Sequence, residues 1–164
     1  MLAVENKTSL IWETLQKVAD PEIPVISVVD MGMITQVELL CPSCVRIQMT
    51  PTFVGCPAIS YLQDQIERAI KALGFLRVEV NVDFSTAWTS NRITEKGLQL
   101  LKGFRLSPPK RHNGEVTMES LQEAECPNCG SHNTSLNTPF GPTLCRALHF
   151  CYDCNQAFEQ FKPV

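Results

Sequence analysis

The sequence predicts an α+β protein, a small three-stranded sheet with helices packed on it, followed by a C-terminal zinc ribbon. The first observation is that apolar residues follow helix and strand periods in turn through residues 1–105. The second is that five of the eight cysteines occur from Cys126 onward. Between these regions, Ser107–Gly114 is rich in breakers and has no apolar period, which is typical of a linker. We therefore expect a domain over 1–105, a linker over 106–124 and a ribbon module over 125–164.

The apolar spacing in the first domain predicts helices and strands in the order α-β-β-α-β-α. The first helix begins at Thr8 or Ser9 and ends before Pro21, because proline disfavours helical geometry in the residue before it. The later elements are strands over 34–40 and 45–49, a helix over 57–73, a strand over 78–84 and a helix over about 94–102. Residues 41–44 are the expected hairpin turn between the first two strands.

The composition excludes several classes of protein. The 164 residues include 17 acidic and 14 basic side chains, for a formal net charge of −3. This acidic balance disfavours a protein built mainly to bind nucleic acid. No apolar run approaches the ~20 residues of a membrane span, and residues 1–7 lack a signal-peptide pattern. We therefore expect a cytoplasmic protein with no membrane partner. In a reducing cytosol, close cysteine pairs are more often metal ligands than disulfides.

The C-terminal module carries the strongest chemical signal in the sequence. Two Cys-x-x-Cys knuckles, with 21 residues between them, supply Cys126, Cys129, Cys151 and Cys154. Each knuckle places two thiolates on one tight turn, and strands within 134–140 and 143–150 would bring the knuckles together around a structural zinc ion. Four thiolates hold iron as well, and a redox dithiol is the alternative. His132 and His149 are not needed as ligands, and Cys145 is either a spare strand residue or an additional thiol.

Cys56 is the candidate functional residue of the first domain. It directly precedes the helix expected over 57–73, where unpaired N–H groups and the helix dipole would lower its pKa. This placement suits a metal ligand or a nucleophile, and the alternative is a small buried cysteine in a capping position. All three histidines lie outside this domain, so a Cys-His nucleophilic pair is excluded within it. The carboxylates of Asp20, Glu22 and Asp30 are either hard ligands or turn-forming groups.

Cys41 and Cys44 are expected to lie apart from Cys56. The intervening strand of about six residues would span about 20 Å, at ~3.3 Å per residue. Two thiols are too few for a closed zinc site. We therefore interpret this pair as incidental to the hairpin turn, with an intermolecular metal site as the alternative.

Several motifs resemble those of the metal–sulfur cluster assembly factor family, which are small α+β proteins implicated in iron–sulfur cluster maturation. Those motifs are Asp20–Val25, Asp30–Ile34, Thr50–Thr52, Gly55–Ala58, Ala87–Thr89 and Ser107–Pro109, and in the ribbon Phe140–Leu148 and Phe158–Lys162. The combination of such a domain with such a ribbon resembles the PaaD family, the D subunits of phenylacetyl-CoA epoxidase systems in bacterial phenylacetate degradation.

This resemblance implies a non-catalytic accessory subunit that assists iron–sulfur cluster or iron-centre assembly. Its partners would be the oxygenase subunits or the iron–sulfur reductase, and a homodimer is a further possibility. It implies that Cys56 binds iron or a cluster transiently, that Asp20 and Glu22 are an acidic signature, and that the four knuckle cysteines hold the metal. Cys145 falls where the family's ribbon has an additional cysteine.

The chain departs from the family pattern in two places, and two other functions are open to it. The family's ribbon has a further cysteine after its Phe-Lys pair, where this chain has Pro163, and the pair Cys41 and Cys44 has no counterpart. A structural adaptor that docks oxygenase and reductase subunits through its ribbon is the main alternative function. A thiol oxidoreductase or hydrolase is the other, although no nucleotide-binding glycine pattern supports an enzyme.

Overall fold

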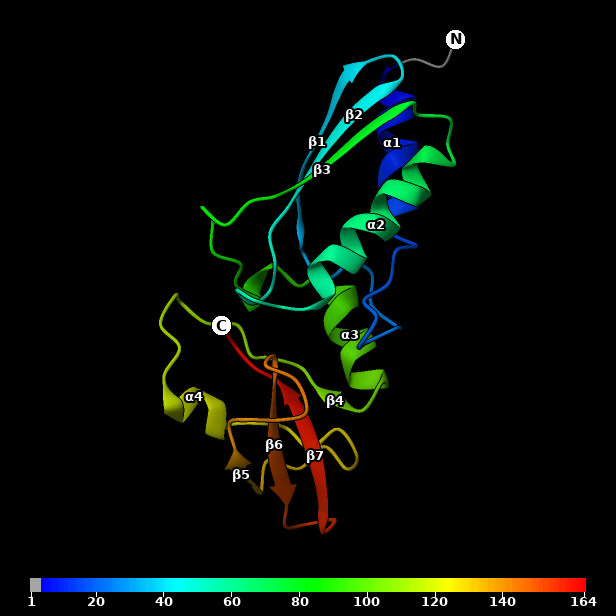
Figure 1. Ribbon diagram of the computed structural model, residues 1–164. Helices are drawn as coiled ribbons and strands as arrows, with labels where there is room; N and C mark the ends of the chain where they lie inside the picture. Colours follow the sequence, from blue (N-terminus) through cyan, green and yellow to red (C-terminus); the bar gives the residue numbers. More distant parts are fainter. Residues whose placement is uncertain (1–3) are drawn as a thin grey trace. The chain divides into compact units, whose positions relative to one another are not determined.

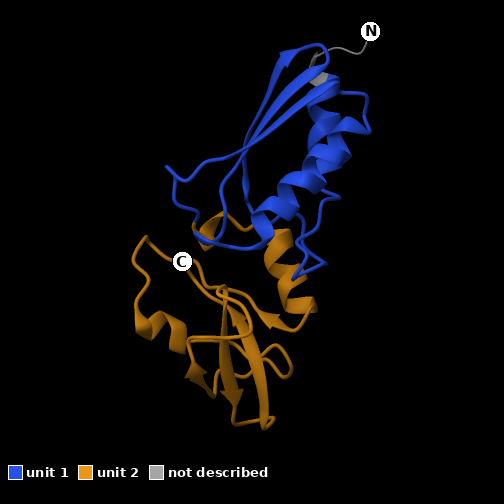
Figure 2. Ribbon diagram, viewed as in Figure 1, with its two compact units in different colours: residues 1–88 blue, residues 89–164 orange. Residues whose placement is uncertain are grey.

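The computed structural model describes residues 4–164, which form two compact units. Figure 2 shows the first unit, residues 1–88, in blue and the second, residues 89–164, in orange. The ranges expected from the sequence, 1–105, 106–124 and 125–164, do not coincide with these units, because residues 89–124 pack with the ribbon. Among the described residues, no helix is long and apolar enough to cross a membrane.

The first unit is a three-stranded sheet with helices on one face (Figure 1). Its elements are α1 (Val4–Leu15), β1 (Ile34–Cys41), β2 (Cys44–Met49), α2 (Ala58–Lys71) and β3 (Arg77–Val82). The strand order is β1-β2-β3, with β2 antiparallel to β1 and parallel to β3. The expected hairpin, the expected helix after it and the third strand are confirmed to within two residues, while α1 begins earlier than expected.

The core of the first unit forms between β2 and α2, as the apolar periods predict. Val45, Ile47 and Met49 are fully buried along β2, because alternate residues of a strand point to the same face. Ile66 and Ile70 are fully buried along α2, whose stripe of apolar residues recurs at helical spacing. The other face of the sheet is polar, and includes a salt-bridge network of Glu38, Arg46, Arg77 and Glu79.

The second unit contains the ribbon and the segment before it. Its elements are the 3₁₀ helix η1 (Ser90–Arg92), α3 (Glu95–Gly103), β4 (Leu106–Ser107), α4 (Met118–Gln122), β5 (Thr134–Thr138), β6 (Arg146–Cys151) and β7 (Gln156–Phe161). The four strands form one sheet in the order β4-β7-β6-β5. The sequence predicted strands in the regions of β5 and β6, but it did not predict β4 or β7.

The segment expected as a linker is anchored in the second unit. Leu106 and Ser107 pair in parallel with β7, and the Ser107 hydroxyl donates to the carbonyl of Glu125 at 2.8 Å. The guanidinium of Arg111 donates to the carbonyls of Asn91 and Ile93. The fold therefore assigns 89–124 to the ribbon's unit, through contacts that a breaker-rich sequence does not reveal.

Truncation of Ile47 should destabilise the first unit specifically. Ile47→Ala leaves a cavity in the centre of β2, and we expect it to lower the free energy of unfolding by about 2–5 kcal/mol. Urea titration followed by tryptophan fluorescence measures this, because both tryptophans, Trp12 and Trp88, lie in the first unit. Gln48→Ala, on the polar face of the same strand, is the matched control and should change stability by less than about 0.5 kcal/mol.

Candidate metal centre and the Cys56 loop

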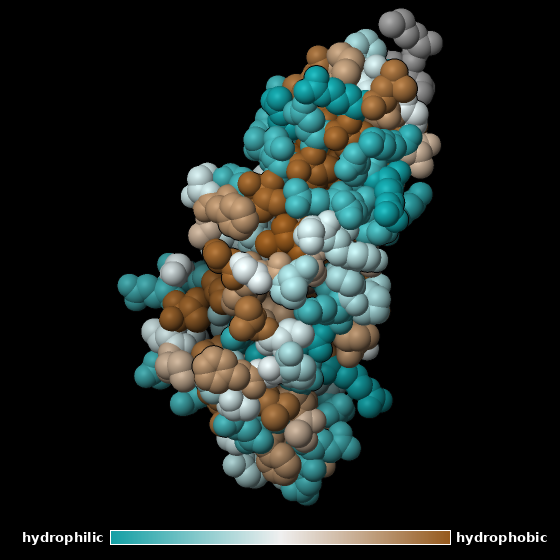
Figure 3. Space-filling model, in the orientation of Figure 1, coloured by the Kyte–Doolittle hydropathy of each residue, from teal (hydrophilic) through white to brown (hydrophobic). Residues whose placement is uncertain are grey.

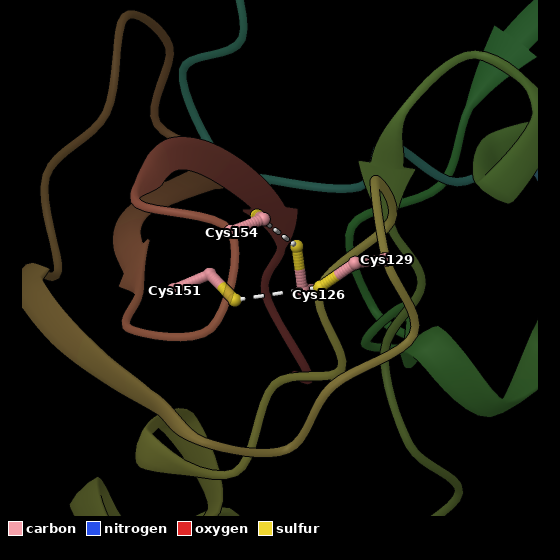
Figure 4. A group of neighbouring side chains, drawn as sticks. All are labelled: Cys126, Cys129, Cys151 and Cys154. Atoms are coloured by element: carbon pink, nitrogen blue, oxygen red, sulfur yellow. Dashed lines mark hydrogen bonds between the residues drawn. The ribbon is translucent and has the colours of Figure 1, made fainter.

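The four knuckle cysteines form one cluster in the second unit (Figure 4). Their four sulfur atoms all lie within 4.8 Å of one another. The Cys126 and Cys154 sulfurs are 3.7 Å apart, and those of Cys129 and Cys151 are 3.6 Å apart. Sulfurs about 2.3 Å from a zinc ion at the corners of a tetrahedron lie about 3.8 Å from one another. The cluster therefore fits a tetrahedral thiolate site for Zn²⁺.

Both knuckles owe their shape to a left-handed residue after the second cysteine. In the first knuckle, Gly130 has φ +75° and its N–H donates to the Cys126 carbonyl at 2.8 Å. In the second, the equivalent residue is Asn155, with φ 56°. Glycine adopts this conformation freely, and asparagine does so more readily than most residues. The sequence signalled the first turn through its glycine and gave a weaker signal for the second.

The thiols of the cluster have divergent proton affinities. Hydrogen bonds from the backbone N–H groups of Cys154 and Asp153 lower the pKa of Cys151 to about 7. Burial and the neighbouring sulfurs of Cys151, Cys129 and Cys126 raise the pKa of Cys154 to about 12. Four thiolates this close together repel one another, so a cation is required for all of them to ionise. The donor set therefore suits a divalent metal better than a group of thiols without one.

Polar and apolar contacts hold the cluster in place. Asp153 of the second knuckle accepts hydrogen bonds from Ser131 and Asn133, which follow the first knuckle. Cys126 and Cys151 are fully buried and share a small core with Phe158. Because this core contains few other side chains, metal binding would contribute much of the folding free energy of the ribbon.

The histidines and Cys145 lie outside the cluster. His149 is fully buried in β6, where its Nε2 pairs with Gln160 Oε1 at 3.0 Å and its ring stacks on Phe158. Burial lowers the pKa of this imidazole, which favours its neutral form. Cys145 precedes β6, and its sulfur lies 3.0 Å from the Thr143 hydroxyl. Of residues 4–164, only the four knuckle cysteines form a group of metal-binding side chains of this kind.

Cys56 lies on the loop between β2 and α2, next to the acidic segment that follows α1. It directly precedes Pro57, the N-cap residue of α2. The carboxylates of Glu22 and Asp20 are close enough to act on the Cys56 thiol electrostatically. Asp20 also has a structural role, because its Oδ1 accepts the backbone N–H groups of Glu22 and Ile23. Three residues that the sequence singled out separately therefore lie within electrostatic range of one another.

The pKa of Cys56 is raised, contrary to the expectation from the helix terminus alone. Burial is the largest cause, and the negative charges of Glu22 and Asp20 add to it. The backbone N–H of Ala58 lowers the pKa, as a helix N-terminus should, but its effect is smaller. The thiol is therefore protonated at neutral pH, which weakens the case for a nucleophile. The two carboxylates give the surroundings of the thiol a negative charge.

Two further buried residues anchor loops of the first unit, and sequence reasoning gave them no role. Thr50 is almost fully buried, and its hydroxyl donates to the Thr86 carbonyl at 2.9 Å. Trp88 is buried and donates from Nε1 to the Met31 carbonyl at 3.0 Å. Both belong to motifs that carry the family resemblance. Asp30, the third candidate carboxylate, is buried and accepts a hydrogen bond from Ser27 at 3.0 Å.

Cys41 and Cys44 form a disulfide across the β1–β2 turn. The interpretation of this pair as incidental is therefore wrong, and the register of the hairpin explains why. Cys41 and Cys44 are directly paired residues of the two strands, with Cα atoms 4.7 Å apart, which lies within the range that a disulfide spans. Cys44 begins β2 and Cys56 follows its end, so the two sites lie at opposite ends of that strand, as expected.

Two family models match the chain, one in each unit. The model described as "Iron-sulfur cluster assembly protein" matches residues 9–82. The model described as "PaaD zinc beta ribbon domain" matches residues 110–162, which include all four knuckle cysteines. The assignment of the C-terminal module as a zinc ribbon is thereby confirmed.

Known proteins resemble the chain as a whole or in its first unit. The D subunit of 1,2-phenylacetyl-CoA epoxidase from Escherichia coli (strain K12) is 37% identical over 154 residues, which cover 94% of this chain and 92% of that protein. The Fe-S protein maturation auxiliary factor of Porphyromonas gingivalis is 29% identical over 85 residues, covering 51% of this chain and 80% of that protein. A domain of unknown function, DUF59, from Bacillus anthracis shares the fold, with a TM-score of 0.55 and 23% identity over 59% of this chain and 92% of that one.

The knuckle cysteines should bind a single zinc ion. The purified chain is expected to contain about one zinc per molecule, and Cys154→Ser should lose it because the variant leaves an incomplete ligand set. Elemental analysis after gel filtration measures the metal content. Cys145→Ser is the matched control and should retain the zinc, so equal zinc contents in the two variants would contradict the ligand assignment.

Alkylation of Cys56 should depend on pH in a way that reflects its raised pKa. Since only the thiolate reacts, the midpoint of the iodoacetamide rate profile should lie above that of an ordinary cysteine. Glu22→Gln removes one negative charge near the thiol and should move the midpoint down. Peptide mapping by mass spectrometry isolates Cys56 from the other cysteines. Glu67→Gln, on the exposed surface of α2, should leave the midpoint where it is.

Proposed function

This chain belongs to the PaaD family, that of the D subunits of 1,2-phenylacetyl-CoA epoxidase, and from this premise we propose that it assists the assembly of an iron–sulfur cluster or iron centre in such an oxygenase system. It acts as an accessory subunit, with iron as its cargo. The clients are the reductase or oxygenase components of that system. Similarity to proteins named as Fe-S protein maturation auxiliary factors supports this role for the first unit.

The observation that carries the proposal is the placement of Cys56, which lies on the loop before α2 within electrostatic range of Glu22 and Asp20. A thiol is a soft donor and a carboxylate a hard one, and both types bind iron; the three side chains are not placed as one ligand group in this structure, so iron would have to draw them together or bind Cys56 with outside ligands. The backbone around them is well defined, because the Asp20 carboxylate fixes its own turn and Thr50 fixes the loop before Cys56.

The protonated state of Cys56 suits the handling of a cargo. Iron must displace a proton from this thiol in order to bind, so its apparent affinity falls as the pKa of the thiol rises. The same competition assists release, since the thiol regains its proton once the iron leaves. A site of this kind binds weakly and exchanges rapidly, whereas the four-thiolate ribbon site retains its metal.

Cluster binding by Cys56 requires ligands from outside the chain. A cluster normally takes four thiolates, and Cys56 is the single cysteine of this site. The remaining ligands would come from a second copy, from the client protein or from a small thiol. The proposed mechanism is therefore transfer within a complex, in which the client's own cysteines replace the temporary ones.

A structural adaptor is the second candidate, and exposed apolar residues on the ribbon favour it. Phe140 and Leu144, on the loop between β5 and β6, have 76% and 59% of their surface exposed. Figure 3 shows that hydrophobic residues gather in several small groups separated by hydrophilic ones on the face it presents. Under this alternative the ribbon docks onto the other subunits and Cys56 binds no iron.

Iron loading should separate these two candidates. Anaerobically purified wild-type chain, incubated with Fe²⁺ and sulfide and then desalted, should retain substoichiometric iron. Cys56→Ala should lower the retained iron by at least about tenfold, as loss of a ligand does, and should keep its zinc. Elemental analysis of both metals in each sample provides the measurement.

The control for this experiment is Cys145→Ala, which removes a thiol that lies outside both sites and should retain iron as the wild type does. Zinc alone in the wild type, with no iron, would favour the adaptor. Iron that is unchanged in Cys56→Ala would remove Cys56 from the proposed mechanism.

A further inference from the structure

We propose that the disulfide between Cys41 and Cys44 is a reversible thiol–disulfide exchange site that low-molecular-weight thiols of the glutathione class reduce. The site is independent of the proposed role of Cys56, because the two lie at opposite ends of β2. Disulfides in a reducing compartment are mostly transient, and serve catalysis or redox sensing.

The backbone keeps the two cysteines paired whether or not their sulfurs are bonded. Cys41 and Cys44 are cross-strand partners at the end of the β1–β2 ladder. The Ser43 carbonyl between them accepts the backbone N–H groups of Leu76 and Arg77 at 2.9 and 3.2 Å, which ties the turn to the start of β3. The Lys7 ammonium donates to the Pro42 carbonyl at 2.7 Å and holds the other side of the turn. Reduction therefore need not disturb the fold.

The polar contacts of the turn distinguish the two sulfurs. The Ser43 backbone N–H donates to Cys41 Sγ at 3.4 Å. The Ser43 hydroxyl lies 3.6 Å from the same sulfur and must be the donor, because a disulfide sulfur carries no hydrogen. Both donors would stabilise negative charge on Cys41 Sγ when the disulfide opens. Cys41 is therefore the better leaving group, and an incoming thiolate attacks Cys44.

The exchange balances with two molecules of thiol. The first thiolate forms a bond to Cys44 Sγ, and Cys41 Sγ departs with the electron pair of the broken bond. The second thiolate attacks the sulfur of the first, which releases the oxidised small-molecule disulfide and leaves Cys44 as a thiolate. Both cysteines then take up protons from solvent. The chain gains two electrons, and two thiols become one disulfide.

Titration with glutathione tests the site in the zinc-loaded, full-length protein. We expect reduced glutathione to generate free thiols at Cys41 and Cys44 together, and oxidised glutathione to restore the disulfide. Differential alkylation with peptide mapping identifies which cysteines react, and tryptophan fluorescence should stay unchanged throughout. Cys41→Ser should accumulate a mixed disulfide at Cys44 under oxidised glutathione, because the variant has no second thiol to displace the adduct.

Ser43→Ala tests the assigned direction of attack. It removes one donor from the leaving sulfur and should slow reduction by about fivefold, corresponding to the loss of a hydrogen bond of about 1 kcal/mol. Ser85→Ala, which removes a hydroxyl beyond the opposite end of β3, should reduce at the wild-type rate. An unchanged rate in Ser43→Ala would overturn the assignment of Cys41 as the leaving sulfur.

Three other outcomes would overturn the proposal itself. Reduction that occurs only with denaturant would make the disulfide structural. A pair that stays reduced in oxidised glutathione would show that no disulfide forms in the folded chain. A second zinc ion per chain, bound after reduction and lost in Cys44→Ser, would make the pair a metal site.

Discussion

The requirement that four thiolates be neutralised by one cation governs the second unit. Its sulfur atoms lie at tetrahedral spacing, and two of the four cysteines are themselves part of the small buried core. Without a cation, four thiolates at this spacing would repel one another, or some of the thiols would have to stay protonated. The sheet that joins β4 to β7 also depends on this centre, because the second knuckle connects β6 to β7. A metal ion bound to the four thiolates would thus stabilise the fold of this unit.

The eight cysteines occupy several chemically different environments, and for six of them the local turns and strand pairing determine which. Two tight turns, each followed by a left-handed residue, bring four of them into one cluster that could hold a metal. A directly paired hairpin position joins Cys41 to Cys44. Cys56 is on a loop beside two carboxylates, which favour its protonated form. The same side chain therefore serves as a permanent ligand, a disulfide partner and, in our proposal, a temporary ligand.

The extent to which the sequence predicted the structure follows from how local each signal was. The Cys-x-x-Cys knuckles and the periods of β2 and α2 are short-range patterns, and they predicted those elements and the four-cysteine cluster. β4 consists of two residues whose pairing with β7 is set by residues far along the chain, so no local period reveals it. The prediction of a lowered pKa for Cys56 failed for the same reason. It used only the nearby helix terminus, whereas burial and the charges of Glu22 and Asp20 depend on the tertiary fold.

The proton affinities of the cysteines bear on how each unit could bind a metal. In the four-cysteine cluster, backbone N–H groups from Cys154 and Asp153 lower the pKa of Cys151 to about 7, whereas burial and the neighbouring sulfurs raise the pKa of Cys154 to about 12. At Cys56 the neighbouring groups favour the protonated thiol, and each binding event must remove a proton. A cation held by all four knuckle thiolates would offset this loss of protons with four bonds, whereas a cation held at Cys56 would gain a single thiolate from this chain. Under our proposal, the chain would therefore retain one metal in its second unit and exchange another in its first.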